Sequence, residues 1–389
     1  MTRKNSILFI IIIAQFCCTS LWFASNGVMN DLVNTFGLSN SAIGHLTSVI
    51  QFGFIVGTLV FAVLTIVDRF SPSKVFFVCA LFGALFNSII VWEEHNLYSL
   101  LSLRFLTGFF LAGIYPVGMK IAADYFEKGL GISLGFLVGA LVLGTAFPHL
   151  LKGLLEPNMW KSVLLFTSII AILGGLLVFL FIPNGPYRVS AKHLDLSAFS
   201  KVFKNTKFRA AAFGYFGHMW ELYTFWAFVP ILLKTYNDLH PHINLNIPLL
   251  SFIVIGIGAL GCIIGGYLSQ GYGTKKIALL ALLLSCICCI ICPFIFTINS
   301  EIVFVGFLIF WGIVVITDSP LFSTLVAQNA SAEIKGTALT IVNCIGFSIT
   351  VVSILLFNIL IESTNSLFIY MVLAIGPLFG LLALSNQKK

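Results

Sequence analysis

Twelve apolar runs, each long enough to cross a membrane, constrain this chain more than any other feature of its sequence. A helix needs about 20 apolar residues to cross the ~30 Å hydrocarbon core of a bilayer. The runs are continuous, whereas the strands of a membrane barrel would show short alternating segments, so each run is predicted to form a helix. The predicted spans are residues 7–28, 42–66, 75–92, 98–119, 130–151, 161–182, 209–235, 248–270, 276–297, 302–326, 336–361 and 366–385.

The composition excludes the soluble classes of protein. Hydrophobic residues make up 59% of the chain and charged residues only 9%, against roughly 25% charged residues in a typical soluble domain. A soluble protein of 389 residues has too small an interior to bury this much apolar surface. A cytosolic enzyme, a secreted disulfide scaffold and a disordered chain are therefore excluded, and an all-α integral membrane protein is predicted.

The Lys and Arg residues set the orientation of the spans. With the N-terminus inside, seventeen of the 21 lie on the cytosolic side, three lie outside, and Arg104 remains within a span. Because positive charge favours the cytosolic face, we expect a multi-pass protein of the cytoplasmic (inner) membrane with both termini cytosolic. The first run follows Arg3 and Lys4 as in a signal peptide, but its length and the lack of a cleavage site predict an uncleaved helix. The inner face also explains the net charge of +7, so no nucleic-acid partner is expected.

The longest connection, residues 183–208, divides the chain into two halves. We expect a six-helix bundle over residues 1–182, a cytosolic linker over 183–208 and a second six-helix bundle over 209–389. Leu196, Phe199 and Phe203 follow helical spacing in the linker, which is typical of a helix lying on the membrane surface. The chain carries no nucleotide-binding loop, so it is not expected to hydrolyse ATP.

The two halves carry an internal repeat. Residues 68–74 align with 270–276, and residues 108–129 parallel 312–336, with offsets between 202 and 207. Offsets near half the chain length indicate two pseudo-symmetric halves in the same orientation, which is a parallel repeat. A substrate would then lie near the midplane, in a central cavity between the halves, and access to it would alternate between the two sides of the membrane.

These repeated segments resemble the major facilitator superfamily of secondary transporters, over essentially the whole chain. The family's loop signature after the second span, G-x-x-x-D-R-x-G-x-K/R-K/R, is matched by Asp68, Arg69 and Lys74, with Leu64 and Ser71 in place of the glycines. The family's fourth span carries an Arg followed by glycines. The residues here that match it are Arg104, Gly108 and Gly113.

The resemblance implies the superfamily's fold, in which 12 transmembrane helices form two bundles around a central cavity. It also implies a cytosolic latch that stabilises the outward-open state. The latch residues implied by the two loop copies are Asp68, Arg69, Lys74, Gly273, Lys275 and Lys276. The family's antiporter signature, G-P-x-x-G-G in the fifth span, has no match in residues 139–148. Its absence disfavours a drug/proton antiporter and favours symport.

Three charged residues lie deep inside the predicted spans, Arg104, Glu221 and Asp318, and His218 lies one turn before Glu221. A charged side chain at the centre of a span costs about 2.5–3.5 kcal/mol on insertion scales, so each one needs a reason. One Arg and two acids leave one carboxyl unpaired, which must be protonated, bind a cation or face water. We therefore hypothesise that Glu221 and Asp318 include the proton-coupling group, with His218 on the same helix face as Glu221 as a relay. The alternative is a structural pair between Arg104 and one acid.

Arg104 also has a second interpretation as a substrate anchor, because a guanidinium binds two oxygens of a carboxylate or phosphate at once. The seventh span adds aromatic side chains around Glu221 that would stack on a flat or cationic substrate. Aromatic and amide side chains in spans also serve in packing and inter-helix hydrogen bonds. The candidate substrate-binding residues are Asn26, Gln51, Arg104, Tyr115, His218, Trp220, Glu221, Tyr223 and Asn343.

The small residues of the spans are interpreted as packing residues. All nine cysteines lie within spans, and Cys289 and Cys292 have the spacing of a redox or metal motif. In a lipid-embedded helix without His or charge nearby, they are better explained as small apolar residues. No disulfide, metal or cofactor is expected. Gly53 and Gly57, like Gly261 and Gly265, have the spacing that lets helix backbones approach closely.

These features predict a monomeric secondary transporter in the lipid bilayer, with protons as the driving ion and a small molecule as substrate. Proton-coupled uptake of a small polar organic solute or anion is preferred, because the antiporter signature is missing. The aromatic seventh span leaves open a proton-coupled exporter of drugs, siderophores or other amphiphiles. A membrane-embedded enzyme is disfavoured by the lack of a metal cluster or nucleophile–base pair, and a receptor by the lack of an extramembrane domain.

Overall fold

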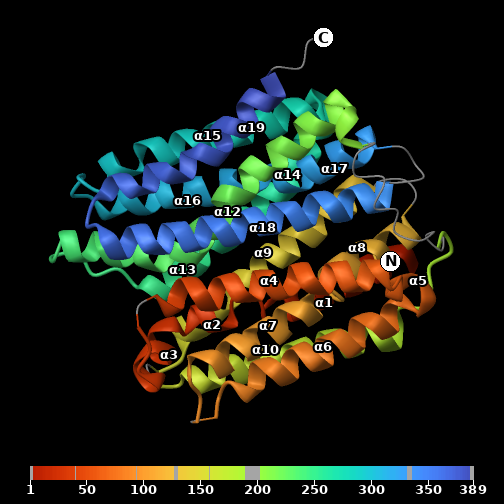
Figure 1. The fold of residues 1–389 in the computed structure, drawn as a ribbon, viewed down its shortest axis with the longest axis horizontal. Helices are drawn as coiled ribbons and strands as arrows, with labels where there is room; N and C mark the ends of the chain where they lie inside the picture. Colours follow the sequence, from red (N-terminus) through yellow and green to blue (C-terminus); the bar gives the residue numbers. More distant parts are fainter. Residues whose placement is uncertain are drawn as a thin grey trace. The chain divides into compact units, whose positions relative to one another are not determined.

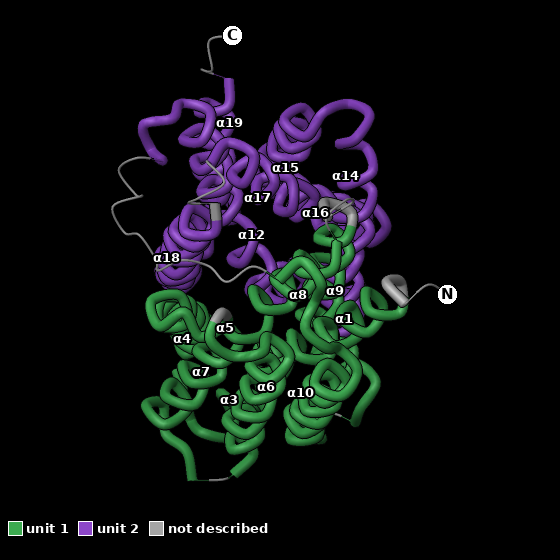
Figure 2. The backbone as a smooth tube through the Cα atoms, turned by 90° about the vertical axis from the view of Figure 1, so that its right-hand side faces the viewer, with its two compact units in different colours: residues 1–194 green, residues 195–389 purple. Residues whose placement is uncertain are grey.

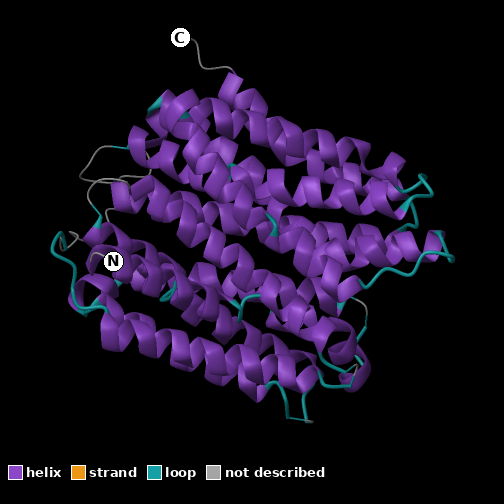
Figure 3. Ribbon diagram, turned by 180° about the vertical axis from the view of Figure 1, so that it is seen from behind, coloured by secondary structure: helices purple, strands orange, loops and turns teal. Residues whose placement is uncertain are grey.

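The computed structural model describes residues 3–39, 41–92, 94–126, 130–156, 158–188, 202–330 and 335–385. Over these ranges every regular element is a helix and no strand occurs, which confirms the predicted all-α fold (Figures 1 and 3). The chain forms two compact units, residues 1–194 and 195–389 (Figure 2). The division falls within the predicted linker, whose residues 189–201, with Leu196 and Phe199, lie outside the described residues.

The first unit is built from long helices that pack side by side, joined by short ones. Within it, α4 packs against α7, α6 packs against α10, and α1 packs against both α9 and α10. The helices are α1 (Arg3–Thr19), α2 (Ala24–Gly27), α3 (Met29–Phe36), α4 (Ala42–Val63), α5 (Ile66–Arg69), α6 (Pro72–Ile89), α7 (Leu97–Leu111), α8 (Tyr115–Tyr125), α9 (Leu130–Leu154) and α10 (Trp160–Phe181).

The second unit is organised around its first long helix, α12, which contacts α13, α17, α18 and α19. Helix α15 packs against α16 and against the 3₁₀ helix η1. The elements are α12 (Thr206–Leu239), α13 (Ile247–Gly256), α14 (Gly258–Tyr272), α15 (Thr274–Ile295), α16 (Glu301–Thr317), α17 (Ser319–Asn329), α18 (Lys335–Ser363), η1 (Leu367–Ala374) and α19 (Ile375–Ser385).

Ten helical segments of the described chain are long and apolar enough to cross a membrane, and they correspond to the predicted spans two to six and eight to twelve. The two remaining spans differ for physical reasons. Helix α12 has 34 residues and is long enough to cross a membrane. His218, Glu221 and several Tyr and Trp residues lower its mean hydropathy, so it is not among the ten apolar segments. The predicted span 7–28 is interrupted, because α1 ends at Thr19 and α2 begins at Ala24.

Side-chain hydroxyls bond to backbone carbonyls where α1 ends. The hydroxyl of Thr19 donates to the carbonyl of Gln15 at 2.7 Å, and the hydroxyl of Ser20 donates to that of Cys17 at 2.7 Å. Hydroxyls bonded back onto a helix tend to bend it. The chain then tightens into turns in which Trp22 N–H bonds the carbonyl of Thr19.

One close helix contact recurs in both units, in agreement with the predicted internal repeat. A Cβ on Gly108 of α7 would lie 2.0 Å from the carbonyl oxygen of Ile50 on α4, and a Cβ on Gly312 of α16 would lie 2.0 Å from that of Val254 on α13. Each residue of the second contact lies 204 positions after its counterpart. The repeat therefore preserves backbone contacts between helices that need glycine, as well as sequence motifs.

Candidate functional site

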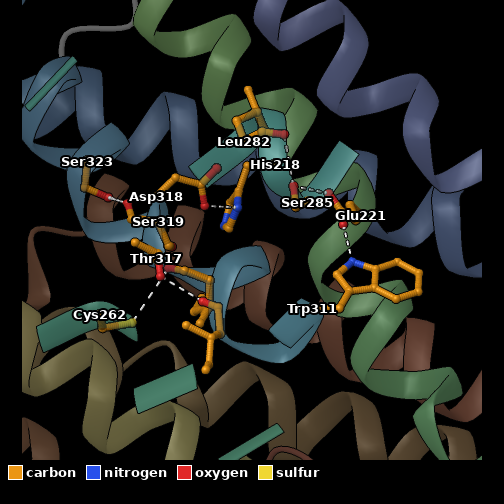
Figure 4. Close-up of polar contacts among 12 residues, drawn as sticks. His218, Glu221, Cys262, Leu282, Ser285, Trp311, Thr317, Asp318, Ser319 and Ser323 are labelled. Atoms are coloured by element: carbon orange, nitrogen blue, oxygen red, sulfur yellow. Dashed lines mark hydrogen bonds and ion pairs between the residues drawn. The ribbon is translucent and has the colours of Figure 1, made fainter. Parts of the chain in front are cut away.

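Glu221 lies in the interior of the second unit, on α12, and its side chain is 1% exposed. Trp311 Nε1 on α16 donates to Oε1 at 2.7 Å, and Cys289 Sγ on α15 donates to the same oxygen at 3.2 Å. Ser285 Oγ, one turn before Cys289, donates to Oε2 at 2.9 Å (Figure 4). Three neutral donors from two helices therefore converge on one carboxyl.

Asp318 forms a second buried acidic centre in the same unit, at the junction between α16 and α17. Nδ1 of His218 on α12 lies 2.8 Å from Oδ1 of Asp318, and both side chains are 1% exposed (Figure 4). Nε2 of His218 and Oδ2 of Asp318 have no hydrogen-bond partner among the described residues. The two side chains can share a proton between Nδ1 and Oδ1. Nε2 of the imidazole and Oδ2 of the carboxyl can each form a further hydrogen bond.

Neither carboxyl has a Lys or Arg partner in the described part of the second unit. The partners of Glu221 are an indole, a thiol and a hydroxyl, and that of Asp318 is an imidazole. His218 and Glu221, which were predicted to share a helix face, therefore have different partners. His218 faces Asp318, whereas Glu221, three positions later on α12, is bound by α15 and α16.

Arg104 lies in the first unit, on α7, and is 1% exposed. Its Nη1 donates to the carbonyl oxygen of Leu21 at 3.1 Å, and its Nη2 donates to that of Trp22 at 2.6 Å. These carbonyls belong to the break between α1 and α2. The sequence suggested a pair with Glu221 or Asp318. The structure instead directs the guanidinium to a helix break, where the freed carbonyls offer the acceptors that a buried cation needs.

Replacing Arg104 with alanine is expected to lower the thermal unfolding midpoint of the purified protein. Two buried carbonyls would lose their donors, at about 1–3 kcal/mol each, and a cavity would remain. Arg104→Lys should have an intermediate effect, because one ammonium cannot reproduce the planar fork. An Arg104→Ala protein with wild-type thermal stability would contradict this structural role. Wild-type substrate affinity in the same variant would remove Arg104 from the substrate site.

The other candidate substrate residues fall into two groups. In the first unit, Asn26 Nδ2 donates to Thr47 Oγ1 at 2.8 Å, and Gln51 Oε1 accepts from Trp22 Nε1 at 3.2 Å. Tyr115 is partly buried at the start of α8. Asn26 and Gln51, 25 positions apart in the sequence, therefore both lie at the interrupted first span, Asn26 on α2 and Gln51 through its bond to Trp22.

In the second unit, the aromatic candidates contact neighbouring elements. Trp220 Nε1 donates to the carbonyl of Val372 at 3.0 Å, and Tyr223 packs against the ring of Phe347 at a centroid distance of 5.4 Å. Asn343 is half-buried on α18. The contacts of Trp220 and Tyr223 connect α12 to η1 and to α18.

The two latch loops have different conformations. In the first, Thr65 has a left-handed φ of 50°, and its hydroxyl accepts from Arg69 Nε at 3.0 Å. Lys74 is exposed, whereas the side chain of Asp68 lies outside the described part of the chain. In the second, Gly273 has a φ of 93°, which favours glycine, and precedes Lys275 and Lys276 on α15.

Sequence reasoning missed the residues that surround Glu221. Ser285 and Cys289 are one turn apart on an apolar helix, and Trp311 is a single Trp on another. Cys289 was assigned to packing together with the other cysteines, all nine of which are free thiols. A lone Ser or Trp facing inward on an otherwise apolar span was the available signal, because a buried N–H or O–H needs an acceptor.

Comparison with known proteins agrees with this fold. The sequence profile of the Major Facilitator Superfamily matches residues 11–354. A bacterial homologue of the human lysosomal transporter Spinster, in an inward-facing and unoccupied conformation, has a TM-score of 0.72 at 14% identity, covering 99% of this chain and 96% of that one. A mutant of the nucleoside transporter NupG has a TM-score of 0.72 at 13% identity, covering 97% and 98%.

At such identities the likeness to solved structures establishes the fold alone, and the search of curated proteins finds no match. The family profile, in contrast, covers most of the chain and the motif-bearing segments of both halves. The ten apolar helices of the described residues are consistent with a protein that crosses the membrane many times. The chain belongs to the Major Facilitator Superfamily and is a multi-pass membrane transporter.

Proposed function

We propose that this protein is a proton-coupled secondary transporter that takes up a small polar organic solute. The observation that carries the proposal is the pair of buried carboxyls in the second unit. Glu221 is held by three neutral donors, and Asp318 is held by a histidine. Neither has a Lys or Arg partner among the described residues, so neither carboxyl is held in its ionised form by a permanent cation.

A change of conformation would couple to that proton. The donors of Glu221 come from α15 and α16, which are separate helices from α12. If these helices shift during transport, the ionised carboxylate loses donors that the protonated acid does not need. Proton affinity then differs between the two conformations, and by linkage proton binding shifts the conformational equilibrium. His218 serves as the relay to Asp318, because its Nδ1 lies 2.8 Å from Oδ1 of that carboxyl.

Uptake by symport is the proposed direction, because the antiporter signature is missing from the fifth span. The protein is proposed to act as a monomer in the cytoplasmic (inner) membrane, with both termini cytosolic. Asp68, Arg69, Lys74, Gly273, Lys275 and Lys276 form its latch. Two aromatic rings of α12 pack within the second unit and so do not support an amphiphile exporter. Phe225 lies 4.4 Å from the ring of Trp311, and Phe228 lies 4.9 Å from that of Phe357.

The proposal is tested with the purified protein in proteoliposomes. A thermal-stabilisation screen first identifies a binding solute, and uptake of that labelled solute is then measured with and without an imposed inward proton gradient. We expect the gradient to drive accumulation above equilibrium and a protonophore to abolish it, while exchange of labelled for unlabelled solute continues. Uptake that ignores the gradient and the external pH would contradict proton coupling, and an absence of exchange would contradict transport of that solute.

A further inference from the structure

Buried polar side chains without partners gather around the interrupted first span. Within the described residues of the first unit, both amide atoms of Gln15 lack a hydrogen bond, as do Asn26 Oδ1 and Gln51 Nε2. The same is true of Ser48 Oγ, Thr145 Oγ1 and His149 Nε2. All six side chains are less than a tenth exposed. Native proteins leave few buried polar atoms unpaired, so a concentration in one place needs an explanation.

Contacts between four helices place the residues that carry these groups near the break between α1 and α2. Asn26 on α2 bonds to Thr47 on α4, next to Ser48 and one turn from Gln51. Gly27 of α2 packs directly on Pro148 of α9, since a Cβ there would lie 2.9 Å from that proline. Gly144 of α9 in turn lies against Thr19 Oγ1 at the end of α1. The segments that carry the unpaired groups therefore meet at the break between α1 and α2, with the Gln15 amide one turn before it, beside Gly118 of α8.

Ordinary helix packing does not explain the unpaired hydroxyls. Hydroxyls in helices commonly bond to the carbonyl one turn earlier, and in this unit Thr47, Thr107 and Thr167 do so at 2.7–2.9 Å. Ser48 and Thr145 do not. Leaving such groups unbonded costs folding free energy, so the fold retains a destabilising arrangement here. Buried hydroxyl and amide groups without partners are typical of a binding site in which a ligand supplies the missing hydrogen bonds.

The chemistry of the cluster selects an uncharged ligand. It offers amide N–H donors, amide C=O acceptors, hydroxyls that act as both, and an imidazole nitrogen. It contains no carboxylate, which disfavours a cation. The nearby Arg104 has both terminal nitrogens engaged by Leu21 and Trp22, and only its Nε lacks a hydrogen bond among the described residues. A single Nε–H does not offer the two-nitrogen fork that binds a carboxylate or phosphate, which disfavours an anion. A solute with several hydroxyl groups matches such a mixture, because each hydroxyl both donates and accepts.

We infer that Gln15, Asn26, Ser48, Gln51, Thr145 and His149 form the part of the substrate site that recognises an uncharged, polyhydroxylated solute, such as a monosaccharide, a polyol or a nucleoside. The inference rests on the proposed transport function and names its substrate class. The first unit thus supplies neutral recognition of the solute. The second unit supplies the acids.

The test begins with matched probes that differ in charge. Glucose, glucosamine and glucuronate share a ring but are neutral, cationic and anionic, and uridine and uridine monophosphate form a second matched set. Mannitol, galactose and ribose widen the neutral group. Binding is measured on the full-length protein in detergent or nanodiscs, as a thermal shift followed by calorimetric titration. We expect a neutral probe to bind and its charged analogues to bind at least tenfold more weakly. A charged best binder, or no neutral binder, would overturn the substrate class.

Variants then separate recognition from folding. Thr145→Val and Gln15→Met remove unpaired polar atoms with little change of shape, so we expect the empty protein to keep or raise its unfolding midpoint. Both should bind the neutral probe at least tenfold more weakly. Thr107→Val is the matched control, because Thr107 already bonds to the carbonyl of Leu103, and its affinity should equal that of wild type.

Each outcome decides between two explanations. Lower stability with unchanged affinity in Thr145→Val and Gln15→Met would show that these groups are bonded to ordered water or to the protein, and would overturn the inference. Binding is measured without a proton gradient, so it is independent of coupling. Neutral binding without gradient-driven uptake would refute only the proposed proton coupling, whereas gradient-driven uptake of a charged solute would refute only the inferred substrate class.

Discussion

Replacing Gly312 with alanine is expected to lower the thermal unfolding midpoint of the protein more than any other single methyl addition in the second unit. The new Cβ would lie 2.0 Å from the carbonyl oxygen of Val254 and 3.0 Å from its carbonyl carbon. Ordinary contacts need more than 3 Å, so α16 and α13 would have to separate along a packed face. Overpacking of this kind costs about 1–3 kcal/mol, occasionally more. Gly108→Ala, at the repeat-related contact with Ile50, should have the same effect in the first unit.

Gly306 supplies the control on the same helix. It lies less than two turns before Gly312 on α16, but it is exposed, and nothing lies within 4 Å of a Cβ built there. Alanine is favoured over glycine in a helix by about 1 kcal/mol. Gly306→Ala should therefore leave the midpoint unchanged or raise it, while Gly312→Ala lowers it. Unfolding curves from purified protein in detergent provide the comparison, and equal midpoints for the two variants would contradict the close backbone contact.

The sequence predicted ten of the apolar spans that the structure shows, because membrane crossing is a local property of about 20 residues. Span 161–182, for example, is helix α10, Trp160–Phe181. The glycine spacing at Gly57 and Gly261 also predicted close approach. A Cβ at these positions would lie 2.3 Å from the carbonyl oxygen of Phe109 and 2.6 Å from that of Ile313. Hydropathy did not predict the break at Ser20–Phe23, because it depends on hydroxyl bonds and on an arginine more than 80 residues away.

The candidate site was predictable only in part for the same reason. The cost of burying charge marks Glu221, Asp318 and Arg104 in any apolar run. Their partners depend on which helices meet, and the helix spacing of His218 and Glu221 does not give that information. Trp311 lies 90 residues from Glu221, on a helix whose other residues indicate nothing but burial. Charge balance left open a pair between Arg104 and an acid, whereas in the structure the two terminal nitrogens of Arg104 bond to backbone carbonyls.

Replacing Glu221 with glutamine is expected to separate solute exchange from proton-driven accumulation. The glutamine oxygen can still accept from Trp311 Nε1 and Cys289 Sγ. The new NH₂ group would face Ser285 Oγ. The Ser285 hydroxyl can accept from this group, because its own proton can be donated instead to the carbonyl of Leu282, 3.1 Å away. The fold should therefore survive, with an unfolding midpoint close to that of wild type. The variant cannot bind or release a proton at this position, so accumulation driven by a pH gradient should fall by about tenfold or more, equivalent to ~1.4 kcal/mol of lost coupling.

The matched control replaces a glutamate that is exposed and is not proposed to carry the coupled proton. Glu301, at the exposed start of α16, meets that need, and Glu301→Gln should accumulate solute like wild type. Asp318→Asn should behave like Glu221→Gln if both acids carry the coupled proton, and like Glu301→Gln if Glu221 carries it alone. Gradient-driven accumulation at the wild-type level in both Glu221→Gln and Asp318→Asn would exclude these carboxyls from coupling. Loss of exchange together with accumulation, in a variant that remains folded, would instead place the altered carboxyl in substrate binding.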